Sequence, residues 1–551
     1  MMWSSIMKNL KIKSTTLIMV LTLYFSTILN LSFWRFTYQN IDIASFRIFC
    51  FSASLFLFIA IPLFLLFNLI CTKIIGKPLI IALFLSCSFT NFMMFNYGIH
   101  IDRHMIQNVM ETNIREATDL ITISLFFWIL ITGILPSILV LITSIQYRTF
   151  KEEFKTRFIN FIISVLIVGI CGSGLYKEYA VYGRNHREVQ NIINIVNFTA
   201  GTISYIKRVR WAKRKFVELD QNPQHMDYLK DKKMYTVVVF IVGETARAGN
   251  FSLGGYERKT NPLLEKQDIA YFKDVTACGT ATAISVPCMF SHMNQKKFDV
   301  TDAKFTENLL DLAQKAGYHV IWRENDDGCK GVCERINDVK NMQKTNHPKY
   351  CHEDYCWDEV LLDELNDILP KIKQNTLIVL HTQGSHGPTY YQRYPDKFKK
   401  FLPTCDTADI QDCSLNQIIN TYDNTILYTD YIISQSIDIV KKYPQFESSV
   451  IYVSDHGESL GENNIFLHGM PYRIAPAEQK SVPMLIWMNE NMKKWHYIDY
   501  NCLKSSAEKN IYSHDNLFHS LLGLLAIKTS VYDQRYDLFN ACRTKPLPSA
   551  K

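Results

Sequence analysis

YTVVVFIVGET, residues 235–245, is the stretch that decides the fold of the carboxyl-terminal part of the chain. Residues 235–242 hold no charge and are rich in β-branched and aromatic side chains. A strand with one solvent-exposed face would alternate apolar and polar residues, so this continuous apolar run predicts a strand that is buried on both faces. Gly243 and Glu244 follow it directly.

Four further β-branched runs alternate with helical patterns along residues 231–551. This alternation predicts an α/β domain with a mainly parallel central sheet. The predicted strands are Tyr235–Val242, His319–Trp322, Leu377–Leu380, Ser449–Val453 and Met484–Trp487, and the predicted helices include Thr306–Ala316, Asp358–Ile368, Leu415–Lys442 and Asp515–Leu525.

Polar side chains follow three of these strands where each strand ends. Glu244 follows the first, the pair His381 and His386 the third, and Asp455 with His456 the fourth. Ligands of open parallel sheets bind beyond the carboxyl ends of the strands, so a metal site is expected there. A mixed carboxylate and imidazole set suits zinc better than magnesium or calcium.

The segment CGTATAISVPC, residues 278–288, offers the hydroxyls of Thr280, Thr282 and Ser285 between two cysteines. A hydroxyl becomes an effective nucleophile when a base or a metal lowers its pKa. The residues alone do not choose among the three hydroxyls, and they also allow an ordinary Thr/Ser-rich loop.

The first third of the chain is of a different kind. Five mostly apolar stretches lack Asp, Glu, Lys and Arg. Each is about as long as a membrane-crossing helix, which needs ~20 residues. A five-helix transmembrane domain is therefore predicted over residues 1–177, with the first span kept as an uncleaved anchor. The five stretches are 14–34, 48–72, 78–101, 120–147 and 158–176.

Lysine and arginine predict the orientation of these spans. With the N-terminus inside, the cytoplasmic segments hold nine such residues and the opposite short loops four. Five crossings then place everything after about residue 177 outside the cytoplasm. The predicted domains are a membrane domain over 1–177, a linker over 178–230 and a periplasmic catalytic domain over 231–551.

The linker explains much of the net charge of +7, so no nucleic-acid partner is expected. Lysines and arginines over 207–215 alternate with Trp211 and Phe216. They suit either a solvated face or an amphipathic helix that lies on anionic lipid.

The cysteines agree with an exported domain. Four of the 14 lie in the predicted spans, and the other ten lie beyond residue 270, an even number that predicts disulfides. Zinc ligation by the closely spaced pairs is the alternative. The neighbours are Cys278/Cys288, Cys329/Cys333, Cys351/Cys356 and Cys405/Cys413, which leaves Cys502 and Cys542.

Four motifs carry a resemblance to a known family: VGETAR at 242–247, CGTATAISVPCMFS at 278–291, HTQGSHGP at 381–388 and SDHGESLGE at 454–462. They resemble the lipid A phosphoethanolamine transferases, which include the mobile colistin-resistance enzymes and belong to the alkaline phosphatase superfamily. The resemblance covers nearly the whole chain. It implies an alkaline-phosphatase-like catalytic domain on a membrane anchor.

The resemblance also implies roles for individual residues. Thr282 would be the nucleophile, and His386 and His468 would hold the substrate phosphate or a second zinc. Lys330 would contact the phosphoethanolamine group. Two sets complete the site: the zinc ligands would be Glu244, Thr282, Asp455 and His456, and the donor lipid would be reached by Tyr97, Asn108, Thr112 and Glu116, for which an ordinary loop is the alternative.

The implied reaction has two displacements. Thr282 takes phosphoethanolamine from phosphatidylethanolamine and then passes it to a phosphate of lipid A, which would confer polymyxin and colistin resistance. One tightly bound zinc is expected, with a second during turnover. The protein is expected to be a monomer in a bacterial inner membrane with its catalytic domain in the periplasm.

Other functions compete with this interpretation. A sulfatase would need a C/S-x-P-x-R motif, and Cys278–Thr282 does not provide one. A phosphoglycerol transferase would use the same two steps, and a transferase acting on lipopolysaccharide core sugars would differ only in its acceptor. A membrane-tethered zinc protein without turnover would have no need of Thr282.

Overall fold

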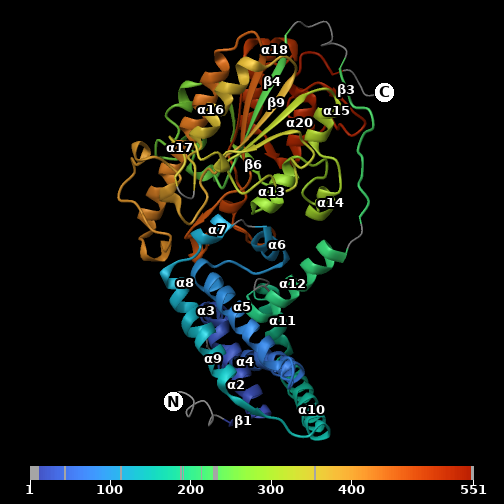
Figure 1. Cartoon of the computed structure of the whole chain (residues 1–551), viewed down its shortest axis with the longest axis vertical. Helices are drawn as coiled ribbons and strands as arrows, with labels where there is room; N and C mark the ends of the chain where they lie inside the picture. The colour runs from blue at the N-terminus through green and yellow to red at the C-terminus, as the bar shows by residue number, and fades with distance from the viewer. Residues whose placement is uncertain are drawn as a thin grey trace. The chain divides into compact units, whose positions relative to one another are not determined.

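The computed structural model describes residues 11–41, 45–111, 114–186, 189, 192–211, 214–226, 234–352 and 355–547 (Figure 1). The chain forms two compact units. One, the helical unit, consists of Met1–Ile106 and Ile121–Tyr205. The other, the sheet unit, consists of Ile206–Lys551 together with the short segment Gln107–Leu120. The linker predicted over 178–230 stays a prediction.

The helical unit contains five helical stretches that are long and apolar enough to cross a membrane, which confirms the predicted spans. Three of the five are single helices and two are composite. They are α2 (Ser14–Thr27) with η1 (Ile28–Asn30) and α3 (Leu31–Asn40); α4 (Phe46–Ile70); α5 (Gly76–Tyr97); α8 (Ile123–Ile129) with η2 (Leu130–Ile134) and α9 (Leu135–Ile142); and α10 (Phe150–Gly174). Also in this part are β1 (Lys11–Lys13), β2 (Ser144–Gln146), α11 (Tyr176–Asn185) and most of α12 (Asn194–Trp211), whose last residues belong to the sheet unit.

A seven-stranded sheet organises the sheet unit, in the order β5-β13-β10-β4-β9-β7-β8. Every neighbouring pair from β10 to β8 is parallel, whereas β13 runs antiparallel to both β10 and β5. The mainly parallel sheet is therefore confirmed. The strands are β4 (Thr236–Gly243), β5 (Ile269–Phe272), β7 (His319–Glu324), β8 (Asp338–Asn341), β9 (Thr376–His381), β10 (Glu447–Ser454) and β13 (Met484–Met488).

All five predicted strands are present in this sheet, and the two strands of the sheet that the sequence did not reveal, β5 and β8, lie at its edges. β5 is short and alternates partly exposed and buried residues, and β8 (DVKN) is partly exposed throughout. Neither edge strand is covered on both faces, so neither needs a continuous apolar run. By contrast, all eight residues of β4 are buried.

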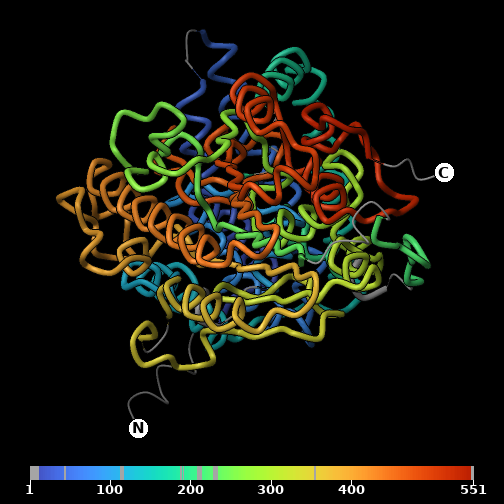
Figure 2. Tube along the Cα trace, turned by 90° about the horizontal axis from the view of Figure 1, so that it is seen from above, coloured from blue at the N-terminus to red at the C-terminus, as the bar shows by residue number. Residues whose placement is uncertain are grey.

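Helices cover both faces of the sheet (Figure 1). One face packs against α15 (Leu309–Lys315) and α20 (Leu517–Leu524), whose leucines join the apolar side chains of the central strands in one core. The other face is covered by α16 (Glu359–Ile368) and α17 (Leu415–Lys441), the long orange helix in Figure 2. The remaining main helices are α6 (Arg103–Glu111), α7 (Ile114–Asp119), α13 (Thr282–Met289), α14 (Val300–Lys304), α18 (Glu490–Trp495) and α19 (Tyr500–Lys509).

The strand register brings the functional ends together. Gly243 of β4 lies opposite Ser454 of β10, and Val242 lies opposite His381 of β9. His381 in turn lies opposite Glu324 of β7. The residues that follow these strands therefore leave the same edge of the sheet at the same level.

Ten cysteines of the sheet unit form five disulfides, which confirms the predicted pairing, including the two cysteines left over by spacing. The four cysteines of the helical unit are free. The disulfides are Cys278–Cys288, Cys329–Cys333, Cys351–Cys356, Cys405–Cys413 and Cys502–Cys542.

Candidate metal and transfer site

Glu244, Asp455 and His456 meet at the carboxyl ends of β4 and β10, and all three are fully buried. The Nε2 atom of His456 lies 3.4 Å from Glu244 Oε1 and 3.3 Å from Asp455 Oδ2. The other oxygen of Asp455 accepts hydrogen bonds from the backbone N–H groups of Thr245 (3.1 Å) and His456 (2.7 Å). The Asp455 carboxylate is thus held by the two loops that leave the strands.

Thr282 joins this cluster from a third direction. It begins α13, within the loop that Cys278–Cys288 closes. Its Oγ1 atom lies 3.2 and 3.3 Å from the two carboxylate oxygens of Glu244 and 3.4 Å from His456 Nε2.

The other two hydroxyls of the loop have different partners. Thr280 donates to the backbone carbonyl of Met470 (2.5 Å), and the Ser285 hydroxyl accepts from the N–H of Gly279 (3.0 Å). Among these three hydroxyls, Thr282 alone contacts Glu244. The three hydroxyls therefore differ in their surroundings, and the hydroxyl of Thr282 is the one that faces the cluster.

The cluster is a set of electron-pair donors that face one another. The His456 Nδ1–H donates to the carbonyl of Gly457 (2.9 Å), so Nε2 presents a lone pair to the two carboxylates. Asp455 Oδ2 is buried and has no hydrogen-bond partner among the described residues. Such an arrangement needs a cation or a proton between its members.

The pKa values of Glu244, Asp455 and His456 also indicate that the cluster needs a cation or a proton. Burial, together with the neighbouring Asp455, raises the pKa of Glu244 well above its usual range. Burial raises the pKa of Asp455 to about 7 and lowers the pKa of His456 to about 4. Two carboxylates and a neutral imidazole in a dry site form a ligand set that fits zinc.

A second acidic and imidazole group adjoins the first and was missed by sequence reasoning. Glu244, Asp326 and His381 also place ligand atoms within 4.8 Å of one another, and all three are buried. Glu324 accepts a hydrogen bond from His381 Nδ1 (3.0 Å). Burial opposes a charge on His381, but Glu324 outweighs it, with smaller contributions from Asp326 and Glu244, and raises the pKa of His381 to about 10.

A sequence signal for this second group existed. Glu324 ends β7, and Asp326 follows it, so the strand-end argument applied to the stretch RENDD at 323–327 would have found both. His381 was considered as a strand-end histidine, but no role was assigned to it.

His386 and His468 extend the site on one side. The ring centroids of His386 and His468 are 5.3 Å apart, and those of His468 and His456 are 4.4 Å apart. His468 Nδ1 donates to Glu458 (2.8 Å), which also accepts from the Tyr390 hydroxyl (2.5 Å). The structure thus brings both predicted histidines beside the cluster.

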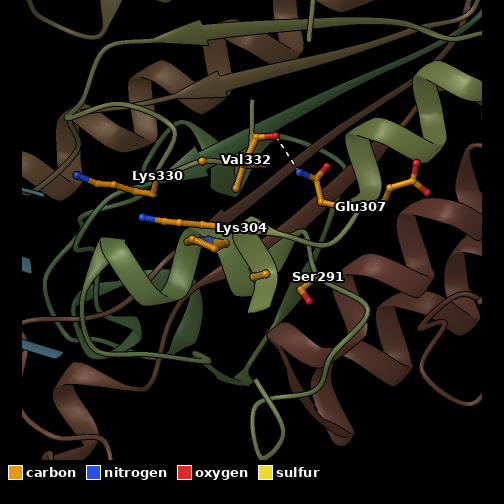
Figure 3. Close-up of a pocket in the computed structure, with 9 residues that line it drawn as sticks. Ser291, Lys304, Glu307, Lys330 and Val332 are labelled. Carbon is orange, nitrogen blue, oxygen red and sulfur yellow. Dashed lines mark hydrogen bonds between the residues drawn. The ribbon is translucent and has the colours of Figure 1, made fainter. Parts of the chain in front are cut away.

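Lys330 lies in a small neighbouring pocket of about 10 Å³, roughly the space that one water molecule needs (Figure 3). The side chain is buried and forms an ion pair with Asp327 (2.6 Å). Pro287 and Ser291, at the far end of the Thr282 helix, line the same pocket.

The predicted donor-lipid residues fall in different places. Tyr97 is buried at the end of α5, where its ring packs against Phe92. Asn108 lies on α6, in the part of it that belongs to the sheet unit. Thr112 lies outside the described residues, and Glu116 is described only as part of the α7 backbone. Their role in binding stays a prediction.

The fold and the cluster define a class of enzyme that transfers or hydrolyses phosphate or sulfate esters. The sulfatase family model matches residues 236–527, and the model for phosphoethanolamine transferase EptA/EptB matches residues 55–209. The chain is 39% identical to phosphoethanolamine transferase EptA of Escherichia coli K12 over 94% of this chain and 95% of that protein. It is 31% identical to phosphatidylethanolamine transferase Mcr-1 of Escherichia coli over 96% and 97% of the two chains.

A solved structure of a phosphoethanolamine transferase has the same fold as this chain. The integral membrane lipooligosaccharide phosphoethanolamine transferase A of Neisseria meningitidis superposes with a TM-score of 0.93 at 36% identity, over 96% of this chain and 99% of that one. The chain therefore belongs to the phosphoethanolamine transferase family, and it is a multi-pass membrane protein with a carboxyl-terminal soluble domain. The resemblance noted in its motifs is confirmed.

Proposed function

We propose that this protein takes phosphoethanolamine from phosphatidylethanolamine and transfers it, through a covalent intermediate on Thr282, to a phosphate of lipid A. The observation that supports this most strongly is the Thr282 hydroxyl, which faces Glu244 and His456 at 3.2–3.4 Å inside a buried cluster. A site built only to bind a metal would not need a hydroxyl there.

Glu244, Asp455, His456 and the Thr282 oxygen would hold one zinc ion, whose ligand preferences their donor atoms match. When bound, zinc lowers the pKa of a coordinated hydroxyl and offsets the negative charge of a transferring phosphoryl group. Asp326 and His381, which share Glu244 with this set, are candidates for a second ion during turnover.

In the first step the Thr282 oxygen forms a bond to the phosphorus of the donor, and the bond from phosphorus to the glycerol oxygen breaks. The hydroxyl proton has the Glu244 carboxylate as an acceptor. The departing diacylglycerol takes up one proton, which His468 can supply from Nε2 when its ring is doubly protonated, while Glu458 holds its Nδ1 atom in place.

In the second step an oxygen of the acceptor phosphate attacks the same phosphorus. The bond between phosphorus and Thr282 breaks, and the threonine oxygen takes back the proton that Glu244 accepted in the first step. A proton from the acceptor phosphate returns to His468. His386 and Lys330 provide positive or hydrogen-bonding groups for the phosphate oxygens. Both substrates are lipids, which accounts for a soluble domain tethered by five membrane-crossing helices.

The proposed location is a bacterial inner membrane, with the sheet unit in the periplasm. Five disulfides among ten cysteines support an oxidising compartment for this unit. A modified lipid A carries less negative charge, so we further propose that the protein confers resistance to polymyxin and colistin. The protein would act as a monomer.

The experiment uses the full chain in detergent micelles with phosphatidylethanolamine and no acceptor. We expect diacylglycerol release and a phosphoethanolamine adduct that peptide mass spectrometry places on Thr282. Thr282→Ala should abolish both, whereas Thr280→Ala, which removes a hydroxyl bonded to Met470, should keep the adduct. An active Thr282→Ala would contradict the covalent step.

The acceptor is tested separately, by mass spectrometry of lipopolysaccharide from cells that express the chain. Phosphoethanolamine on a lipid A phosphate supports the proposal. Modification of a core sugar would show that the acceptor is a core sugar and not lipid A. A phosphoglycerol adduct on Thr282 would show that the donor is not phosphatidylethanolamine.

A further inference from the structure

Asp358 is a buried carboxylate that the proposed reaction does not use. It lies at the amino end of α16 and is 4% exposed. An aspartate at this position usually accepts hydrogen bonds from the first backbone N–H groups of its own helix. In α16, whose residues the structure describes throughout, the side chain of Asp358 makes no such bond. Its partners lie elsewhere.

Those partners follow two different strands of the sheet. Asp358 Oδ1 accepts from the backbone N–H of Gln383 (2.8 Å), and Oδ2 accepts from that of Gly384 (3.0 Å). Both of these donors lie in the loop that follows β9. Oδ1 also accepts from the side-chain amide of Asn325 (2.7 Å), which follows β7 directly. One carboxylate therefore ties together two of the loops that leave the functional edge of the sheet.

Gly384 connects Asp358 to the metal site. It adopts a left-handed conformation with a φ of +52°, and a Cβ atom there would lie 2.5 Å from the carbonyl oxygen of Glu244. The next N–H group along the chain, that of Ser385, donates to the same oxygen (3.0 Å). The loop that accepts its position from Asp358 thus packs directly on the backbone of Glu244, and His386 follows in the same loop.

Asn325 makes a second link to this edge of the sheet. Its backbone N–H donates to the carbonyl of His381 (2.9 Å). The next residue, Asp326, shares the second ligand group with His381 and Glu244. The hydrogen bond from Asn325 to Asp358 therefore also restrains the segment that carries Asp326.

The position of Asp358 has a free-energy cost. Burial raises the pKa of Asp358, and the three hydrogen bonds offset this rise only in part. A buried charge is retained in a protein where hydrogen bonds or ions compensate it. Because all three donors belong to loops of the candidate site, the placement of this carboxylate is explained by the site and not by α16.

We propose that Asp358 is a positioning residue that holds the backbone of Gln383 and Gly384 against Glu244, and thereby orients the Glu244 carboxylate for metal binding. The proposal rests on the proposed function, because Glu244 belongs to its zinc set. Asp358 acts through Gly384 and supplies no ligand atom itself. Removing an outer group of this kind typically changes metal affinity or activity by about 10- to 100-fold.

Asp358→Asn tests the role with little change in size. One acceptor oxygen becomes an NH2 group, which cannot accept from a backbone N–H. In the purified full-length protein, competition with a chromophoric zinc chelator should show a zinc Kd about 10- to 100-fold weaker than that of wild type. Turnover at limiting zinc should fall with the zinc occupancy, whereas the KM for phosphatidylethanolamine should stay within about twofold. Asp367→Asn, at an exposed position of the same helix, is the matched control and should change neither constant.

Gly384→Ala tests the route by which Asp358 acts. The added methyl group would meet the Glu244 carbonyl, so the zinc Kd should again be weaker. Because both changes act through one loop, the double variant should weaken zinc by less than the product of the two single effects. A purely structural role of Asp358 would lower the unfolding temperature and leave the zinc Kd, measured well below that temperature, unchanged. A wild-type zinc Kd in folded Asp358→Asn, or fully multiplicative effects in the double variant, would overturn the proposal.

A milder change covers the case in which Asp358→Asn does not fold. Asn325→Ala removes one of the three donors and leaves the carboxylate in place. It should weaken zinc in the same direction, and an unchanged zinc Kd would overturn the proposal.

Failure of the proposed function would look different. An active Thr282→Ala, beside a weaker zinc Kd in Asp358→Asn, would contradict the covalent step and support the positioning role. An inactive Thr282→Ala, beside an unchanged zinc Kd in Asp358→Asn, would refute the positioning role alone.

Discussion

The Nδ1 atom of His468 lies 2.8 Å from the Oε2 atom of Glu458, whose side chain is fully buried. Glu458 comes from the SDHGE stretch that follows β10, and its other oxygen accepts from Tyr390. Because Glu458 accepts from Nδ1, Nε2 is the ring nitrogen of His468 that would bind and release a proton in the proposed reaction. The carboxylate therefore sets the working tautomer of a histidine beside the cluster.

We predict that Glu458→Gln lowers kcat by about 10- to 100-fold, the usual effect of removing an outer partner of this kind. Its zinc content, measured by inductively coupled plasma mass spectrometry on the purified chain, should equal that of wild type. Glu490→Gln, at a side chain that is 89% exposed, is the control. Normal turnover in Glu458→Gln would show that the tautomer of His468 is unimportant.

Turnover should depend on a bound metal, and substitutions in the two groups of candidate ligands should change the zinc content differently. Strong chelation should abolish turnover, and added zinc should restore it. Glu244→Gln, which changes a residue shared by both groups, should lose zinc and activity together. Asp326→Asn should keep one equivalent of zinc, because Asp455 and His456 remain. Full activity of a demonstrably zinc-free preparation would refute metal dependence.

The disulfide that closes the loop around Thr282, the proposed nucleophile, should support both stability and catalysis. Cys278→Ala with Cys288→Ala opens a loop with a sequence separation of 10. Chain entropy predicts a loss of about 2.7 kcal/mol for a loop of this size. Denaturant unfolding measures that loss, and kcat should fall because Thr282 is less well held. Removing Cys405–Cys413 in the same way should cost stability but leave kcat unchanged.

The pH dependence of stability should report His514. Its Nδ1 atom accepts from the N–H of Cys278 (3.2 Å), and its Nε2–H donates to the carbonyl of Ser454 (3.0 Å). Burial lowers the pKa of His514 to about 3. An unfolded histidine takes up a proton near pH 6.5, whereas the folded one stays neutral, so stability falls as the pH falls from about 6.5 toward 3.

The expected slope from this one group is at most about 1.4 kcal/mol per pH unit, with no contribution above about pH 7. Unfolding of the full chain at pH 7.5 and pH 5.0 measures it. His514→Gln should flatten the difference between the two values, and His352→Gln, at an exposed position, should not. An equal slope in His514→Gln and wild type would contradict this assignment.

Much of the architecture follows from the sequence because it depends on local composition. A membrane-crossing helix needs only a long apolar run, and all five runs became helices. A strand covered on both faces needs a short apolar run, which is how β4 and β9 were found, while the edge strands β5 and β8 were missed. Cysteines close in sequence paired with their neighbours.

The sequence by itself also indicated the edge of the sheet at which the candidate site lies, since strands of a parallel sheet present their carboxyl ends at one edge. The tertiary structure alone decided which groups meet there. It placed the hydroxyl of Thr282, and not that of Thr280, against Glu244, and it brought Asp326 and His381 to Glu244. It also joined Asp358 to Gln383 and Gly384. These choices depend on strand register and on side-chain direction between segments far apart in the chain, and no local pattern encodes either one.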